Sequence, residues 1–188
     1  YTPALGTRLP VVTFPSASGS FSDVTYSGGI AYDAEHDAHS VDLVVIDTAP
    51  PVVVCGSADG TWHDDNVSIG CTASDAETGL ADAGDASFDL TTSLPAGQES
   101  ADEATDSREV CDNAGLCSAA GPVTGNQIDR KDPGVTVTTP VEGATVAKGS
   151  TVDADYACTD AGSGVDSCDG DVESGAAIDT STTGPQTF

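Results

Sequence analysis

The sequence is poor in basic residues: it has five Lys and Arg against 31 Asp and Glu, which gives a formal net charge of −26. Binding to nucleic acid or to an anionic membrane surface requires clustered Lys and Arg, so no nucleic acid or anionic membrane partner is expected. Cations are the small partners that this charge favours. Because most of the acids are Asp, which prefers turns and strand ends, we expect the charge to lie on loops.

Large apolar side chains and long apolar runs are also scarce. The chain has no Met, one Trp, four Phe and four Tyr. No signal peptide and no segment of membrane-spanning length is visible, so direct membrane insertion is not expected. The apolar residues are mainly Val and Ala, which favours several small cores over one large enzyme core.

Long amphipathic helical patterns are absent, and short alternating runs dominate. The best helical candidate is the short stretch 98–105. Runs separated by Gly, Pro, Asn and Asp at intervals of about 8–12 residues are typical of an all-β sandwich. The predicted strands are 21–26, 29–32, 41–46, 52–54, 67–71, 88–91, 135–138 and 151–158.

Two parts of the sequence return after roughly 80–90 residues. The stretch 71–82, which begins Cys-Thr-Ala-Ser-Asp, returns as 158–166, and the Pro-rich stretch 47–54 returns as 130–137. Such a period is long enough for each copy to bury its own core, so we expect tandem domains. The predicted domains are 1–46, a partial domain or N-terminal strand segment; 47–130; and 131–188, which lacks its C-terminal end.

The six cysteines are best explained as disulfides. Six cysteines allow 15 pairings, but their spacing favours three local bridges. A zinc site is the alternative, and the absence of a C-x-x-C pair counts against it. Disulfides indicate an oxidising compartment, so we expect an extracellular or cell-surface location. The expected bridges are Cys55–Cys71, Cys111–Cys117 and Cys158–Cys168.

Several motifs resemble bacterial extracellular Ig-like repeats. They are D-T-A-P-P-V at 47–52, G-T-W at 60–62, V-S-I-G-C-T-A-S-D at 67–75 and V-C-D-N-A-G-L-C at 110–117. The first of them is also similar to hyalin-type (HYR) repeats. The resemblance implies tandem Ig-like β-sandwich domains, secretion, and a role in stalks, adhesins or surface filaments. It brings no catalytic residues with it.

Acidic loops at the same place in both repeats are candidate cation sites. Calcium binds six to eight oxygens, and carboxylates on flexible loops supply them. The alternative is a polar turn in which Asp caps its own backbone, and no EF-hand loop is present. A high acidic count also keeps a secreted protein solvated. The candidate residues are Asp75, Glu77 and Asp82 in the first loop, and Asp160 and Asp166 in the second.

The sequence favours a structural function over catalysis. No G-x-S-x-G elbow or motif-placed Cys/His pair is present, so we do not expect an enzyme. Trp62 is either an aromatic anchor of a sandwich or a surface for stacking a sugar. The alternative functions are a glycan- or surface-binding module, with or without calcium, and an accessory module of a secreted hydrolase.

Neighbouring copies of the chain are the expected macromolecular partners. We expect the third domain to lack its last strand, which predicts an unpaired sheet edge near Phe188. Either the chain continues into that edge, or the segment 12–32 of another molecule supplies the strand.

Overall fold

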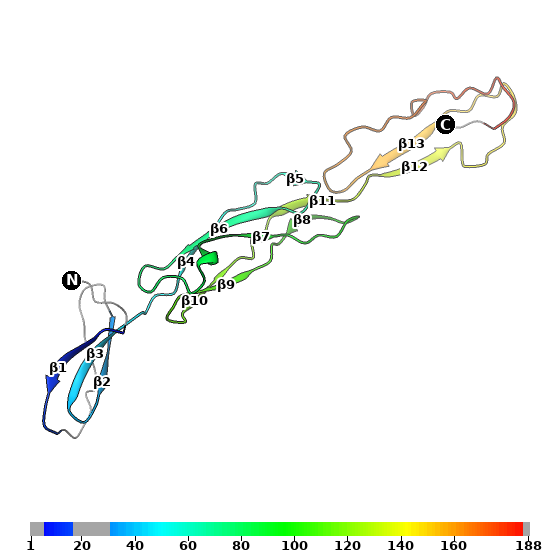
Figure 1. Cartoon of the computed structure of the whole chain (residues 1–188). Helices are drawn as coiled ribbons and strands as arrows, with labels where there is room; N and C mark the ends of the chain where they lie inside the picture. Colours follow the sequence, from blue (N-terminus) through cyan, green and yellow to red (C-terminus); the bar gives the residue numbers. More distant parts are fainter. Residues whose placement is uncertain (1–5, 17–30, 186–188) are drawn as a thin grey trace. The chain divides into compact units, whose positions relative to one another are not determined.

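The computed structural model describes residues 6–16 and 31–185, and these residues form an all-β chain (Figure 1). Thirteen strands lie in five sheets of two or three strands, with one short 3-10 helix and no α-helix in this part of the chain. No helix among the described residues is long and apolar enough to cross a membrane. The all-β prediction is confirmed. The expected edge at Phe188 and most of segment 12–32 lie outside the described residues.

The chain divides into two compact units. The first contains the described residues of Tyr1–Ser57 together with Ser68–Thr91 and Thr105–Val123. The second contains Ala58–Val67, Thr92–Ala104 and the described residues after Val123. The domain boundaries expected at 46/47 and 130/131 stay a prediction.

In the first unit, the N-terminal sheet is antiparallel with the order β1-β3-β2. These strands are β1 (Arg8–Thr13), β2 (Ala31–His36) and β3 (Ser40–Ile46). The sequence predicts β3 from its apolar alternation, and Val41 and Val45 are indeed buried. Because β3 is the central strand, the residue that follows it, Asp47, is held at a fixed end of the sheet.

A second sheet of this unit carries its main core. β6 (Ser68–Ser74) pairs with β4 (Val52–Cys55) on one side and β7 (Ser87–Thr91) on the other. A hairpin of β9 (Arg108–Cys111) and β10 (Cys117–Ala120) belongs to the same unit. Alternate residues of β6 face inward, as period-two patterning requires. The core consists of buried Cys71, Leu90 and Ala120, with Val53, Cys55, Phe88 and Val123 packed against them.

The second unit contains two further sheets. β11 (Asn126–Asp129) is central and pairs in parallel with β5 (Trp62–His63) and antiparallel with β8 (Glu99–Glu103). Ile128 of β11 is fully buried, which fixes this strand and therefore the position of Asp129 at its end. The other sheet pairs β12 (Gly134–Thr139) with β13 (Asp155–Thr159).

The helix expected over 98–105 is wrong, because residues 99–103 form strand β8. Pairing with β11 satisfies their backbone groups and overrides the weak helical preference of Glu and Ala. The only helix of the described residues is the 3-10 helix η1 (Ala83–Ala86). Asp82 caps the N-terminus of this helix, because its carboxylate accepts a hydrogen bond from the Gly84 amide at 2.8 Å.

The cysteines form the three pairs that the spacing favours, Cys55–Cys71, Cys111–Cys117 and Cys158–Cys168. The first joins opposed residues of β4 and β6, and the second joins opposed residues of β9 and β10. The third ties β13 to the loop that follows it. Three disulfides indicate an oxidising environment.

We expect the bridges to contribute unequally to stability. The Cys55–Cys71 pair spans 16 residues and the Cys111–Cys117 pair spans 6. By loop-closure entropy, replacing the first pair by alanines costs about 3 kcal/mol and replacing the second about 2 kcal/mol. Urea melts of the two double variants measure the difference, and non-reducing peptide mapping of the wild type checks the pairing. A bridge between different repeats, or a larger loss from the shorter loop, would contradict this expectation.

Candidate functional site

Three aspartates from distant parts of the sequence meet in the first unit. Asp47 follows β3, Asp75 follows β6, and Asp112 lies in the turn between β9 and β10. One carboxylate oxygen from each lies within 4.8 Å of the other two. We call these residues the first acidic cluster.

Backbone amides orient the carboxylate of Asp75. Its Oδ1 accepts hydrogen bonds from the amides of Glu77, Thr78 and Gly79 at 3.1, 2.7 and 2.8 Å. Gly79 has a φ of 76°, a left-handed conformation that an L side chain would strain. In this Asp-x-x-x-Gly sequence, the loop therefore closes around the Asp75 carboxylate, and the glycine permits the backbone turn that this requires.

The turn between β9 and β10 holds Asp112 in the same way. Oδ1 of Asp112 accepts from the amides of Ala114 and Leu116 at 2.8 and 2.9 Å. Asp112 is only 2 % exposed. The side chain of the next residue, Asn113, donates to the Thr78 carbonyl at 2.9 Å, which joins this turn to the loop after β6.

We call residues 47–51, between β3 and β4, the first linker, and residues 129–133, at the end of β11 and before β12, the second linker. The first linker is bonded to the same loop. The Thr78 hydroxyl donates to Oδ2 of Asp47 at 2.5 Å, and Oδ1 of Asp47 accepts from the Ala49 amide at 3.1 Å. The Thr48 amide donates to the Glu77 carboxylate at 3.2 Å. These three bonds fix the first residues of the linker on the loop after β6.

The charges of this cluster are incompletely balanced. A hydrogen bond shared with the Asp47 carboxylate raises the pKa of Glu77, and the negative charges of Asp47 and Asp75 raise it further. The pKa of Asp47 is lowered, first of all because the Thr78 hydroxyl donates to its carboxylate. Among the residues that the structure describes, Asp47, Asp75 and Asp112 form no ion pair with Lys, Arg or His.

A second acidic cluster lies in the second unit. It consists of Glu99 of β8, Asp129 at the end of β11 and Asp160 after β13, with carboxylate oxygens again within 4.8 Å of one another. Ser163 donates to Oδ2 of Asp129 from its hydroxyl at 2.7 Å and from its amide at 2.8 Å. These bonds lower the pKa of Asp129. The Gly164 amide donates to Oδ1 of Asp160 at 2.8 Å.

The two linkers therefore use the same bonds at equivalent places. The last residue of β6 pairs with the first residue of β4, and Asp75 follows it directly. In the same way, the last residue of β13 pairs with the first residue of β12, and Asp160 follows it directly. The carboxylate of this loop aspartate accepts a hydrogen bond from the amide of a glycine with positive φ four residues later. The hydroxyl residue just before that glycine donates to the aspartate of the linker. The equivalent pairs are Asp47 and Asp129, Asp75 and Asp160, Thr78 and Ser163, and Gly79 and Gly164.

This equivalence corrects the alignment taken from the sequence. The shared Cys-Thr letters place Cys71 against Cys158. In the structure Cys71 opposes Cys55 at the end of β4, whereas Cys158 opposes Val135 near the start of β12. The strand register therefore decides which residues of the two repeats are equivalent, and by this register Cys71 and Cys158 are not equivalent.

A lysine distinguishes the second cluster from the first. Nζ of Lys131 lies 3.0 Å from Oε1 of Glu99. The Glu99 carboxylate, followed by the charges of Asp160 and Asp129, raises the pKa of Lys131. Lys131 stands two residues after Asp129, and the residue two places after Asp47 is Ala49. The second cluster thus contains its own cation, and the equivalent position of the first linker has none.

The cation candidates of the sequence are distributed as follows. Asp75 and Asp160 belong to the two clusters, and Glu77 lies beside Asp47. Asp82 caps η1, and Asp166 is exposed in the loop after β13. Sequence reasoning missed Asp47, Asp112, Glu99 and Asp129. One signal was available, since Asp47 and Asp129 each precede a linker proline by four residues, Pro51 and Pro133.

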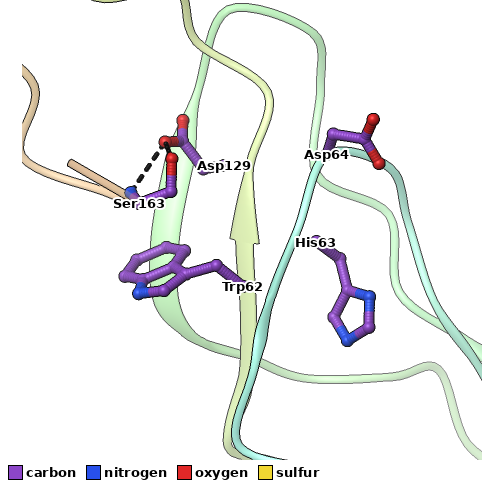
Figure 2. Close-up of a pocket in the computed structure, with 5 residues that line it drawn as sticks. All are labelled: Trp62, His63, Asp64, Asp129 and Ser163. Atoms are coloured by element: carbon purple, nitrogen blue, oxygen red, sulfur yellow. Dashed lines mark hydrogen bonds between the residues drawn. The ribbon is translucent and has the colours of Figure 1, made fainter. Parts of the chain in front are cut away.

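A small pocket of about 260 Å³ lies in the second unit. Its lining residues are Trp62, His63, Asp64, Asp129 and Ser163. Figure 2 shows the Trp62 indole beside Ser163, which donates to Asp129, with His63 on the opposite side of β5. Trp62 is half-buried and lines the pocket, and its backbone pairs with β11.

Comparisons of the sequence and structure with models of protein families, with curated proteins and with solved structures find no match. The resemblance to Ig-like repeats therefore depends on the quoted motifs alone.

Replacing Thr78 by valine should weaken the first linker. The substitution keeps the shape of the side chain and removes the hydroxyl that donates to Asp47. We expect the Thr78→Val variant to melt a few degrees below the wild type in calorimetry, and Ser163→Ala to act similarly on the second linker. The exposed Thr72 of β6 offers a matched control, Thr72→Val. Equal melting points for Thr78→Val and Thr72→Val would show that the Thr78 bond contributes nothing.

Removing the charge of Glu77 should stabilise the cation-free protein at neutral pH. Because its pKa is raised on folding, the folded state binds the Glu77 proton more tightly than the unfolded state does. That contribution is present while Glu77 is protonated and is lost as pH rises through the raised pKa. With EDTA present, Glu77→Gln should therefore melt higher than wild type at pH 7 and nearly equal to it at about pH 4. Thermal melts of Glu77→Gln and of the exposed control Glu142→Gln test this, and a lower melting point at pH 7 would contradict it.

Proposed function

We propose that this chain is a structural repeat segment of a secreted or surface bacterial protein, built from tandem Ig-like β-sandwich domains. Its role is to space or display other parts in a stalk, adhesin or filament. The observation that carries the proposal is the repeated linker bond, from Thr78 to Asp47 and from Ser163 to Asp129. A spacer requires that each linker be held on the next repeat in the same manner, and these bonds supply that repetition.

Other properties support the same role. Short antiparallel strands joined by turns are typical of Ig-like sandwiches. Local disulfides resist unfolding of small domains in an oxidising medium. The net charge of −26 keeps an exposed segment solvated and opposes nonspecific association.

A spacer predicts ordered linkers, which NMR relaxation measures. The amides of Thr48 and Ala49 should have order parameters near those of β6, about 0.85. The Thr78→Val variant should lower them at Thr48 and Ala49 only, and Thr72→Val should leave them unchanged. Linker order parameters below about 0.6 in the wild type would contradict the proposal.

A glycan-binding module is the second candidate, and the pocket beside Trp62 is the observation that favours it. A partly exposed indole next to hydroxyl and carboxylate groups is a surface on which a sugar ring can stack. A glycan array should then give saturable binding that Trp62→Ala abolishes and Thr72→Val leaves intact. Absence of such binding, with ordered linkers, favours the spacer.

A further inference from the structure

We propose that the first acidic cluster, Asp47, Asp75 and Asp112, binds one Ca²⁺ ion. One oxygen of each carboxylate lies within 4.8 Å of the others. Two oxygens that bind the same Ca²⁺ at about 2.4 Å can stand up to about 4.8 Å apart, so each pair of these oxygens lies within the span of one ion. Three oxygens at this upper limit need only a small inward movement for one Ca²⁺ to bind all of them. Mg²⁺ needs oxygens at about 2.1 Å in octahedral geometry and would require the carboxylates to draw closer. The inference concerns the linker alone and holds whether or not the chain is a spacer.

A buried carboxylate oxygen without a partner points to a ligand at this place. Among the described residues, three buried side-chain oxygens accept no hydrogen bond: Asp85 Oδ1, Glu99 Oε2 and Asp112 Oδ2. Asp85 is in contact with the guanidinium of Arg108, and the other oxygen of Glu99 holds Lys131. Asp112 is 2 % exposed, and no Lys, Arg or His of the described residues forms an ion pair with it. A charged oxygen buried in this way is costly unless it is paired, and a bound cation pairs it.

The hydrogen bonds of the cluster leave one carboxylate oxygen free on two of its three aspartates, Asp75 and Asp112, while both oxygens of Asp47 also accept a hydrogen bond. Asp112 and Asp75 accept all of the amide bonds described above through Oδ1. The second oxygen of each carboxylate is therefore available while the turns stay intact. The same turns fix both side chains in advance, which reduces the conformational entropy lost on binding.

The second cluster shows what the first one lacks. There the ammonium of Lys131 lies against Glu99 and acts on Asp129 and Asp160 as well. In the first linker the equivalent residue is Ala49, and Glu77 adds a fourth carboxylate beside Asp47. The same hydrogen-bond pattern thus occurs once with a lysine ammonium and once without one. In the first cluster, Ca²⁺ supplies the positive charge that Lys131 supplies in the second. Water molecules complete the six to eight oxygens that Ca²⁺ takes.

Calorimetric titration tests the site on the whole chain after removal of cations with EDTA. CaCl₂ should bind with a stoichiometry near one at constant ionic strength, and the melting temperature should rise with Ca²⁺ concentration. Equal molar MgCl₂ should bind at least about tenfold more weakly, since its geometry fits less well. Absence of binding up to millimolar Ca²⁺, or a continuous weak uptake that matches MgCl₂, would overturn the proposal and leave only screening of the acidic surface.

Asp112→Asn is the decisive substitution. Its side-chain oxygen can still accept the Ala114 and Leu116 amides, while an amide nitrogen replaces the unpartnered Oδ2. Ca²⁺ affinity should fall at least about tenfold, and the melting temperature in EDTA should stay equal to or exceed that of the wild type. The matched control is Asp160→Asn, at the equivalent loop of the second cluster. Equal loss of affinity in both variants, or none in Asp112→Asn, would overturn the assignment.

A gain of internal charge provides a second, independent test. Ala49 is exposed, so Ala49→Lys should fold, and it places an ammonium where the second linker has Lys131. This variant should melt higher than wild type in EDTA and bind Ca²⁺ at least about tenfold more weakly. Thr48→Lys, one residue earlier in the same linker, adds the same net charge at another position. If both variants weaken Ca²⁺ binding equally, the effect is one of net charge and the assigned site is wrong.

Discussion

The loops of this chain depend on one interaction, the hydrogen bond from a backbone amide to an aspartate carboxylate. Asp75, Asp112 and Asp160 all hold their loops in this way, and so does Asp37 between β2 and β3. The cores are small, so turns that satisfy their own backbone carry much of the local order. Because one oxygen is enough for this task, the second oxygen of each carboxylate can serve another partner. The abundance of Asp thus has a structural cause before it has a functional one.

In the two linkers, different side chains provide structural order and charge balance. Order comes from the hydroxyl bonds of Thr78 and Ser163 to the linker aspartates, and a neutral hydroxyl donor leaves the negative charge of each aspartate unbalanced. Charge balance comes from Lys131 in one linker, and no cationic side chain of the described residues supplies it in the other. A linker can therefore keep its hydrogen-bonded geometry while its electrostatic free energy changes with the medium. The two contributions need not be lost together.

The sequence predicted what is local and missed what is assembled over distance. Strands such as β6 and β3 were readable because alternation is a property of adjacent residues. The cysteine pairs were readable because each bridge closes a short loop. Strand β8 was misread as a helix because only its long-range partner β11 decides its conformation.

The candidate site also depends on strand pairing that the sequence alone does not predict. Asp75 was visible beside its loop glycine, but Asp47 and Asp112 join it only through strand pairing across the unit. The repeated Cys-Thr letters also suggested a register that the strands do not use. Identical letters are a weaker guide to equivalence than the pairing of the strands that carry them, because side-chain direction follows register.

Burial decides which ions can balance the first cluster. Dissolved monovalent salt screens exposed charges such as Glu77 over a distance of about 8–10 Å. It acts much less on Asp112, because that carboxylate is almost completely shielded from solvent. An ion must therefore be bound directly to neutralise Asp112, and a divalent ion offsets more of the repulsion per site than a monovalent one. Lys131 supplies a positive charge beside the second cluster at any salt composition. On the Ca²⁺ proposal, the first linker keeps the same hydrogen-bonded geometry, but its stability depends on the cations in solution.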